Sequence, residues 1–403
     1  MKLGQAAGAA HLTYCTNIHR GESWADTRAA LERYLPEVKR QAAPTLAMGV
    51  GLRLSNVASE TLAAQAGELE AFKVFLAEHG LYVFTINGFP YGPFHGTRVK
   101  EDVYQPDWRF AERLAYSNRL ADLLLELLPE TTDIDGSIST VPATFRPIGA
   151  TPGAVAKIQE NLLQHAAHLV RARERTGRTI TLALEPEPMC YLETSEELVP
   201  FLEAQIFAKT AVARFVTLTG LSVGAAEAAL RRHIGICYDV CHAAIEFEDP
   251  AGSIARLRNA GIGIFKLQLS AALKVARVDA DTLPQLRRFD EGVYLHQVVE
   301  RRADGNLVRY LDLAPAFAEI DRAYGSEWRV HCHVPVFMDK LPALGTTQDF
   351  LREILAIHKR SPISPHLEVE TYTFDVLPEE LRRVDVATAV VRELDWVNQR
   401  LSA

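Results

Sequence analysis

Acidic and imidazole side chains follow two apolar segments in the middle of this sequence. Thr179–Glu185 ends in Glu185, and Ile234–Asp239 ends in Asp239, with His242 three residues further on. Carboxylate and imidazole groups that converge at the ends of strands are suited to hold a divalent metal ion or to carry protons. The first chemistry that the sequence predicts is therefore metal-assisted or acid–base catalysis.

Two later segments carry the same residue types on one face of a predicted strand. His331 and His333 lie two residues apart in Trp328–Val334, and Glu370 lies near the end of His366–Thr373. Alternate residues of a strand point to the same side, so the two imidazoles share a face. Buried imidazoles and carboxylates need hydrogen-bond, metal or basic partners. These residues are therefore candidates for metal binding or proton transfer.

Further polar side chains are candidates for contact with a substrate. Lys266 and Gln268 alternate along one predicted strand and suit a polyol or a phosphate; pairing of Lys266 with a buried glutamate is the alternative. The loop 88–96 is rich in Gly, Pro and aromatic residues, which predicts either the wall or lid of a ligand site or a hydrophobic cluster. The remaining candidates, from the first strands and this loop, are His19, Asn87 and His95.

Structural roles are the alternatives for the same residues. Glu185 is also compatible with a solvated loop carboxylate, Asp239 with a helix N-cap, and His242 with a hydrogen-bonded buried imidazole. Cys237 and Cys241 do not have the spacing of a structural zinc site, and no CxxC pair occurs in the sequence. We therefore expect oxygen and imidazole ligands at a metal site rather than thiolates.

The composition excludes several classes of protein. The chain has 403 residues, 48% hydrophobic and 23% charged, and its net charge of −8 disfavours binding to nucleic acid or to an anionic membrane. No apolar run approaches the roughly 20 residues of a membrane helix, and the first ten residues lack the apolar core of a secretory signal. Five scattered cysteines disfavour a disulfide scaffold, so the expected location is the cytoplasm.

Short apolar or β-branched segments alternate with longer helical patterns along most of the chain. This order predicts a parallel sheet with helices outside, and the length fits a (β/α)8 TIM barrel, in which functional residues lie at the C-terminal ends of the strands. A doubly wound open sheet is the alternative, but no GxGxxG motif is present. The nine candidate strands, one more than a barrel needs, are His11–Asn17, Leu46–Leu54, Leu81–Asn87, Gly136–Thr140, Thr179–Glu185, Ile234–Asp239, Ile262–Ser270, Trp328–Val334 and His366–Thr373.

The absence of a Ser/Gly-rich linker predicts a single domain over residues 1–403. The turn sequence Asp304-Gly305-Asn306 lies between two apolar–polar runs, which predicts an inserted β-hairpin at residues 293–310. Residues 374–403 are expected to contain a C-terminal helix, with its helical pattern beginning at Pro378.

Strand-end Glu185, the Asp239-x-x-His242 spacing, a histidine-bearing strand and Glu370 in the last strand together resemble the xylose isomerase-like TIM barrels. That superfamily includes sugar isomerases and epimerases and endonuclease IV. The resemblance implies a xylose isomerase-like barrel that binds a divalent ion (Mn, Zn, Co or Mg) through Glu, Asp, His and Glu at successive strand ends.

The resemblance assigns the metal ligands Glu185, Asp239 and Glu370, with His331 or His333 as the histidine. The superfamily commonly offers a histidine from the strand that carries Lys266 and Gln268 in this chain. Weak ligation by Gln268 and the absence of a metal are therefore the alternatives.

A closer resemblance is to the EboE family of metabolite traffic proteins. It is carried by HLTYCTNIH at residues 11–19, NGFPY at 87–91 and HLEVETY at 366–372. Such proteins are encoded with a prenyltransferase-like membrane protein and other enzyme-like proteins, a set implicated in moving or finishing a secondary-metabolite precursor across the inner membrane. The resemblance implies a small-molecule metabolite as ligand, the proteins of that pathway as partners, and no nucleic-acid partner.

The leading hypothesis is a metal-dependent sugar or polyol isomerase or epimerase that acts on a metabolite of such a pathway. Glu185 and Glu370 are expected to act as ligands and proton carriers, while Lys266 assists catalysis and, with His242, contacts substrate oxygens. A non-catalytic metabolite carrier is the main alternative. A nuclease similar to endonuclease IV is a weaker one, because the chain is acidic.

Overall fold

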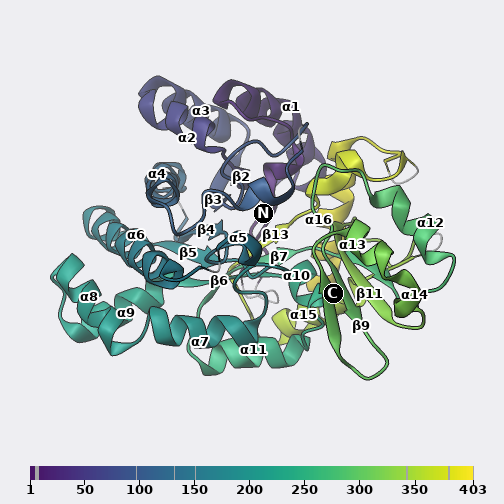
Figure 1. The fold of residues 1–403 in the computed structure, drawn as a ribbon. Helices are drawn as coiled ribbons and strands as arrows, with labels where there is room; N and C mark the ends of the chain where they lie inside the picture. Colours follow the sequence, from purple (N-terminus) through teal and green to yellow (C-terminus); the bar gives the residue numbers. More distant parts are fainter. Residues whose placement is uncertain are drawn as a thin grey trace.

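Eight parallel strands form a nearly closed barrel, with helices around it, in the computed structural model (Figure 1). The structure describes residues 1–4, 9–96, 98–130, 132–149, 151–341, 344–379 and 382–402. The strand order is β1-β13-β7-β6-β5-β4-β3-β2, and a parallel bridge between Cys15 and Gly51 joins the two ends. The predicted (β/α)8 barrel is therefore confirmed. Its strands are β1 (His11–Tyr14), β2 (Met48–Arg53), β3 (Leu81–Asn87), β4 (Gly136–Thr140), β5 (Ile180–Leu184), β6 (Ile234–Asp239), β7 (Ile264–Leu269) and β13 (His366–Val369).

The barrel strands are buried on both faces, since one face fills the barrel and the other packs beneath the helices. Side-chain caps begin several of the helices: Ser23 accepts a hydrogen bond from the Asp26 amide, and Asp249 caps a helix whose first residue is Pro250. The helices are α1 (Trp24–Ala42), α2 (Asn56–Ala64), α3 (Ala66–Glu78), α4 (Ala111–Leu127), α5 (Arg146–Gly149), α6 (Ala154–Thr176), α7 (Ser195–Gln205), α8 (Lys209–Thr219), α9 (Val223–His233), α10 (Val240–Ile245), α11 (Pro250–Asn259), α12 (Thr282–Leu286), α13 (Leu313–Ala318), α14 (Ile320–Ala323), α15 (Gln348–Arg360) and α16 (Val386–Ser402).

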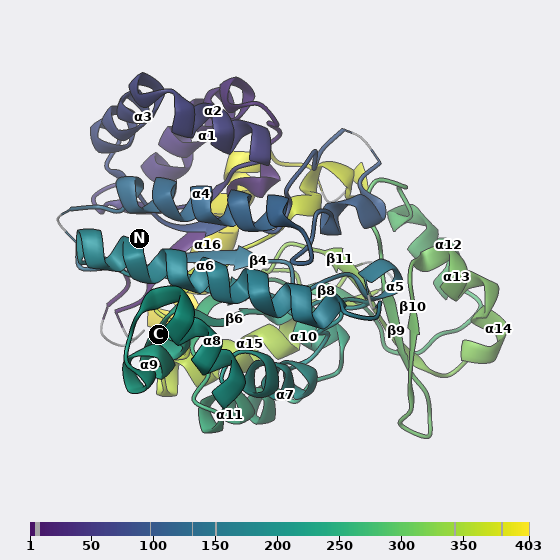
Figure 2. The same cartoon turned by 60° about the vertical axis from the view of Figure 1, so that its left-hand side comes forward.

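A second, antiparallel sheet is inserted between β7 and β13. Its order is β10-β9-β11-β8-β12, and with α12–α14 it lies at one side of the barrel (Figure 2). It has an apolar cluster of its own, which includes Leu273, Val298 and Trp328. The strands are β8 (Ala272–Val275), β9 (Val298–Arg301), β10 (Leu307–Tyr310), β11 (Glu327–His333) and β12 (Gly345–Thr346).

The inserted sheet accounts for the one candidate strand more than a barrel needs. Eight of the candidate segments contribute to the barrel, but Trp328–Val334 forms most of β11, which pairs antiparallel with β8 and β9. A strand's own residues do not reveal whether its partners run parallel or antiparallel, so the sequence alone did not separate it from the others. The predicted hairpin is confirmed as β9 and β10, within the larger sheet.

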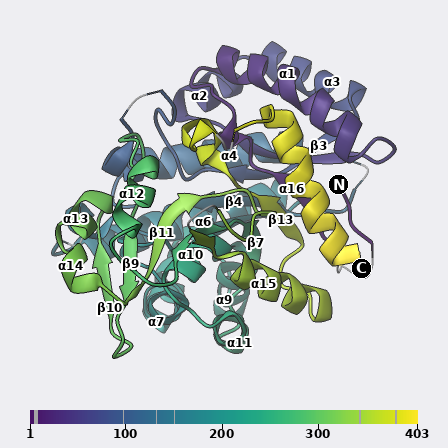
Figure 3. The same cartoon turned by 90° about the vertical axis from the view of Figure 1, so that its right-hand side faces the viewer.

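The C-terminal helix begins later than the sequence pattern indicates. Residues 380, 381 and 403 of the predicted C-terminal segment lie outside the described part of the chain, and α16 begins at Val386, not at Pro378. Figure 3 shows α16 running beside α1, the first helix of the barrel. Among the described residues, no helix is both long and apolar enough to cross a membrane.

Candidate metal centre

Three carboxylates meet at the C-terminal end of the barrel. Glu185 follows β5, Asp239 ends β6 and Glu370 follows β13. One oxygen atom of each lies within 4.8 Å of the other two, and all three side chains are buried. The structure thus brings together three of the ligands expected from the sequence, and Glu185 is not the solvated loop carboxylate that was its alternative.

The environment of these carboxylates opposes the accumulation of negative charge. Burial, together with the charges of Glu370 and Asp239, raises the pKa of Glu185 well above its usual value. Burial and the charge of Asp239 raise the pKa of Glu370 in the same way. Glu185 Oε2 and Asp239 Oδ2 are buried and have no hydrogen-bond partner among the described residues. Oxygen donors in this state fit a divalent cation, which would offset their repulsion and satisfy the two free atoms.

Asp239 also caps α10. Its Oδ1 accepts a hydrogen bond from the His242 amide at 3.1 Å and from the Ser270 hydroxyl at 2.7 Å. Burial alone would raise the pKa of Asp239, but the nearby His242 and His333 rings and these hydrogen bonds lower it. The helix-cap alternative is therefore correct, and it leaves Oδ2 available as a ligand.

Two asparagines hold Glu370 in place. The side-chain amides of Asn17 and Asn87 both donate to Glu370 Oε1, at 2.8 and 2.9 Å. Asn87, predicted to contact substrate, therefore has a carboxylate as its partner and also lines the adjoining cavity. Two donors on one oxygen fix the carboxylate orientation and favour its ionised form.

Three imidazoles surround the carboxylates. His242 belongs to α10, whereas His331 and His333 reach the barrel from β11 of the inserted sheet. Burial lowers the pKa of His333 to about 4 and that of His331 well below its usual value, so both rings are neutral and have a lone pair to offer. The two histidines therefore reach the site from outside the barrel, which corrects the position that the sequence order suggested for their strand.

Three polar residues form a chain of hydrogen bonds that begins at His331. Gln297 Oε1 lies 2.8 Å from His331 Nδ1, and the Gln297 amide nitrogen contacts the Tyr104 hydroxyl at 2.8 Å. Tyr104 in turn donates to Glu187 Oε1 at 2.6 Å. No sequence pattern indicated a role for these three residues. Glu187 carries a weak signal, since it lies two residues after Glu185, but Gln297 lies within the insertion and gives none.

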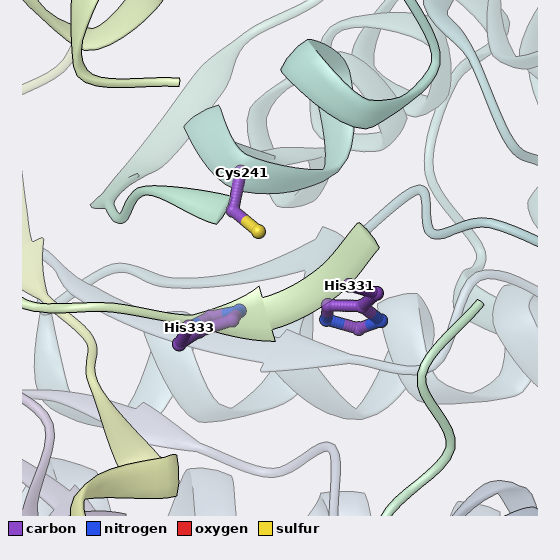
Figure 4. A group of neighbouring side chains, drawn as sticks. All are labelled: Cys241, His331 and His333. Atoms are coloured by element: carbon purple, nitrogen blue, oxygen red, sulfur yellow. The ribbon is translucent and has the colours of Figure 1, made fainter. Parts of the chain in front are cut away.

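Cys241 lies close to the same histidines. Figure 4 shows it at the start of α10, with its sulfur facing the strand that carries His331 and His333. The sulfur and one nitrogen of each ring lie within 4.8 Å of one another. Burial raises the pKa of the Cys241 thiol well above its usual value, so the thiol is protonated, and a protonated sulfur is a poor metal ligand.

Lys266 and Gln268 do not lie at the cavity. Lys266 is fully buried inside the barrel, where its Nζ lies 2.5 Å from Glu368 Oε2. Gln268 is also fully buried, and its Oε1 accepts a hydrogen bond from the Cys237 thiol at 2.7 Å. The structure therefore corrects the expected contacts of both residues with a substrate, and pairing of Lys266 with a buried glutamate, the alternative, is correct.

His19 and His95 line a different pocket. His19 stacks on Tyr34 with ring centroids 4.2 Å apart, and its Nε2 lies 2.9 Å from the Tyr14 hydroxyl. The pocket beside it includes His95 and Arg20 but none of the three clustered carboxylates. The expectation that these two histidines contact the substrate of the metal centre is therefore corrected.

Aromatic residues cover the metal centre. The cavity is lined by Glu185, Glu187, His242, His331 and Glu370 on one side, and its volume is about 50 Å3. This is room for an ion and a few water-sized groups, so a sugar-sized ligand requires the wall to move. Part of the wall comes from loop 88–96, as the sequence indicated. The aromatic residues of the wall are Phe89, Phe94, Tyr104, Tyr294 and Tyr372.

Comparisons with known proteins identify the fold. No protein-family model matches the chain, and no curated protein matches its sequence. A xylose isomerase-like TIM barrel protein from Mycobacterium smegmatis, solved in complex with magnesium, is similar with a TM-score of 0.53 at 12% identity, covering 98% of each chain. L-ribulose 3-epimerase gives a TM-score of 0.47 at 13% identity, over 98% of this chain and 94% of that one. The IOLI protein with a bound zinc atom gives 0.45 at 12% identity, over 97% of each. The first likeness shows a xylose isomerase-like TIM barrel fold.

Proposed function

We propose that this protein is a divalent-metal-dependent isomerase or epimerase of sugar-like or polyol-like metabolites. The observation that carries the proposal is the convergence of Glu185, Asp239 and Glu370 at the C-terminal ends of three barrel strands. His333 is the proposed fourth ligand. Its Nε2 is buried without a hydrogen-bond partner among the described residues, and one of its ring nitrogens lies within 4.8 Å of an Asp239 oxygen. Three oxygens and one imidazole suit Mn, Mg, Co or Zn.

Each residue of the site has a separate role in the proposed proton transfer between carbon atoms. A bound divalent ion would polarise vicinal substrate oxygens and acidify the adjacent C–H bond. Glu185 and Glu370 have pKa values raised by burial, which suits carboxyls that accept a proton and return it. Asn17 and Asn87 hold Glu370 at a fixed orientation for that step. The aromatic wall excludes water from the reacting carbon.

Two further considerations support the proposal. The similar barrel from Mycobacterium smegmatis was solved in complex with magnesium, in keeping with a divalent ion in this protein. The sequence resemblance to the EboE family suggests that the substrate is a secondary-metabolite precursor, and we propose the proteins of such a pathway as partners.

Hydrogen–deuterium exchange at carbon tests the reaction class. Metal-loaded protein is incubated in deuterated water with a panel of ketoses, aldoses and keto derivatives of cyclic polyols, and proton NMR follows loss of the C–H signal beside the carbonyl. We expect exchange with at least one compound class, and a loss of at least about 10²-fold in Glu185→Gln and Glu370→Gln. Wild-type protein that retains no divalent ion after metal soaking would contradict the proposal.

A metabolite carrier is the second candidate, and the aromatic wall of the cavity favours it. The same experiment separates the two. A carrier binds a panel compound without exchange, and Glu370→Gln leaves that affinity intact. An isomerase or epimerase shows exchange that the substitution abolishes.

A further inference from the structure

The hydrogen bonds around His242 and His331 fix which ring nitrogen of each carries the proton. His242 Nδ1 lies 2.9 Å from the Pro186 carbonyl oxygen, which only accepts, so Nδ1 carries the hydrogen. In the neutral ring, the Nε2 atom of His242 therefore presents a lone pair.

The same reasoning holds for His331. One end of the Gln297 side-chain amide lies 3.3 Å from the Pro188 carbonyl oxygen and next to the Tyr104 hydroxyl oxygen. Tyr104 donates its proton to Glu187, so both of these oxygens are acceptors toward Gln297. Acceptors at that end require the amide nitrogen there, so Gln297 Oε1 faces His331 and accepts from its Nδ1. His331 Nε2 therefore also presents a lone pair.

The two lone pairs point at each other. His242 Nε2 and His331 Nε2 lie 3.1 Å apart, and both rings are buried. Two lone pairs that face each other at this distance repel, so the arrangement needs a proton or a metal ion between them. Two imidazole nitrogens bound to one tetrahedral ion at bond lengths of about 2.0–2.1 Å lie about 3.3 Å apart, close to the observed separation. An oxygen of Glu187 and one ring nitrogen of each of the two histidines all lie within 4.8 Å of one another.

We propose a second metal site, held by His242, His331 and Glu187, beside the carboxylate site. Its nitrogen ligands and single carboxylate suit Zn²⁺ or Co²⁺. Hydrogen bonds from each Nδ1 to a fixed oxygen orient both rings, as is usual for metal-bound histidines. The site is distinct from the Glu185, Asp239 and Glu370 group, and the inserted sheet supplies one of its ligands through β11. The inference does not depend on the proposed reaction.

Metal counting tests the second site. Chelator-stripped full-length protein is reloaded with Zn²⁺ or Co²⁺, dialysed, and the ions per chain are measured by mass spectrometry of the elements. We expect about two ions in the wild type and about one in His331→Gln and Glu187→Gln. His168→Ala, which removes a histidine of helix α6 at the surface, should keep both and is the matched control. A wild type with one ion and an unchanged count in His331→Gln would overturn the proposal and would indicate a proton shared between the two rings.

A positioning variant guards against loss of folding. Gln297→Leu removes the acceptor of His331 Nδ1 without removing a ligand, and we expect a 10- to 100-fold weaker affinity for the second Co²⁺ ion, read from its visible absorption. Equal affinities in the wild type and Gln297→Leu would contradict the second site. The carboxylate site is tested independently of the second site. If it exists, Glu370→Gln should lose the ion held by the carboxylates and keep the ion whose affinity depends on Gln297.

Discussion

Lys266 of β7 and Glu368 of β13 form an ion pair in the middle of the barrel. Their Nζ and Oε2 atoms lie 2.5 Å apart, and neither side chain has exposed surface. Burial lowers the pKa of Lys266, but the charge of Glu368 outweighs it, so the net shift is upward and the lysine remains charged. The pair places opposite charges inside the barrel, and Glu368 lies two residues before Glu370 of the candidate metal site.

Removing one member of this pair should destabilise the protein strongly. Lys266→Met leaves Glu368 charged and buried without its partner, and we expect a loss of about 3–5 kcal/mol in the free energy of unfolding. The double variant Lys266→Met/Glu368→Leu removes both charges and should recover most of that loss. Urea unfolding measures the free energy of unfolding of the wild type, the single variant and the double variant. As a control, Lys73→Met removes two surface ion pairs, with Glu70 and Glu126, and should cost under about 1 kcal/mol. A loss in Lys266→Met no larger than in that control would contradict the prediction.

Gly51 of β2 makes room for the same ion pair. A Cβ atom at this position would overlap Glu368 Oε1 and would lie 2.7 Å from the Tyr14 carbonyl oxygen. We expect Gly51→Ala to cost about 1–3 kcal/mol, because the paired carboxylate has no free space into which to move. Gly67 of α3 is the matched control, since no atom lies within 4 Å of its added Cβ. Alanine there should stabilise the helix by about 0.5–1 kcal/mol, and thermal melts of the two variants should shift in opposite directions.

The sequence was informative about the barrel because its strands are short and buried, and most of them are followed by a helix. The strand-end residues Glu185, Asp239 and Glu370 could be predicted for the same reason, since parallel strands end at the same edge. Apart from the hairpin of β9 and β10, the inserted sheet could not be predicted, because strand pairing between distant segments leaves no local pattern. The expected roles of four further residues, His19, His95, Lys266 and Gln268, were wrong for a different reason. Their residue types suggested chemistry, but their side chains lie away from the cavity beside the carboxylates. That residues 1–403 form one domain stays a prediction.

Stability should fall with rising pH through the titration of Glu393. This carboxyl of α16 is fully buried and accepts hydrogen bonds from the Thr371 hydroxyl and the Val336 amide, and burial raises its pKa to about 7. Its folded pKa lies above the unfolded value, so its contribution is complete below about pH 4.5 and is lost as the pH rises through about 7. The loss amounts to roughly 3 kcal/mol.

Urea unfolding at about pH 5 and about pH 7.5 checks this dependence. Glu393→Gln carries no titrating group, so its two unfolding free energies should differ by roughly 2 kcal/mol less than those of the wild type, since part of the total loss falls outside this pH interval. Glu203→Gln replaces an exposed glutamate of α7 and should keep the wild-type dependence. The same slope in Glu393→Gln as in the wild type would assign the pH dependence to other groups.

Asp239 caps α10 and is a proposed metal ligand, and two substitutions should separate these two roles. Asparagine can cap α10 through its side-chain oxygen, whereas alanine cannot, so Asp239→Ala should lose about 1 kcal/mol of stability without metal and Asp239→Asn much less. Divalent ion at about 100 times its dissociation constant should stabilise the wild type by about 2.7 kcal/mol, and both variants should lose most of that gain. Thermal melts with Mn²⁺ and with chelator measure both effects. Asp249→Asn changes the equivalent cap of α11, away from the carboxylates, and should keep the full metal response. If Asp239→Asn kept that response as well, Asp239 would be a helix cap and not a ligand.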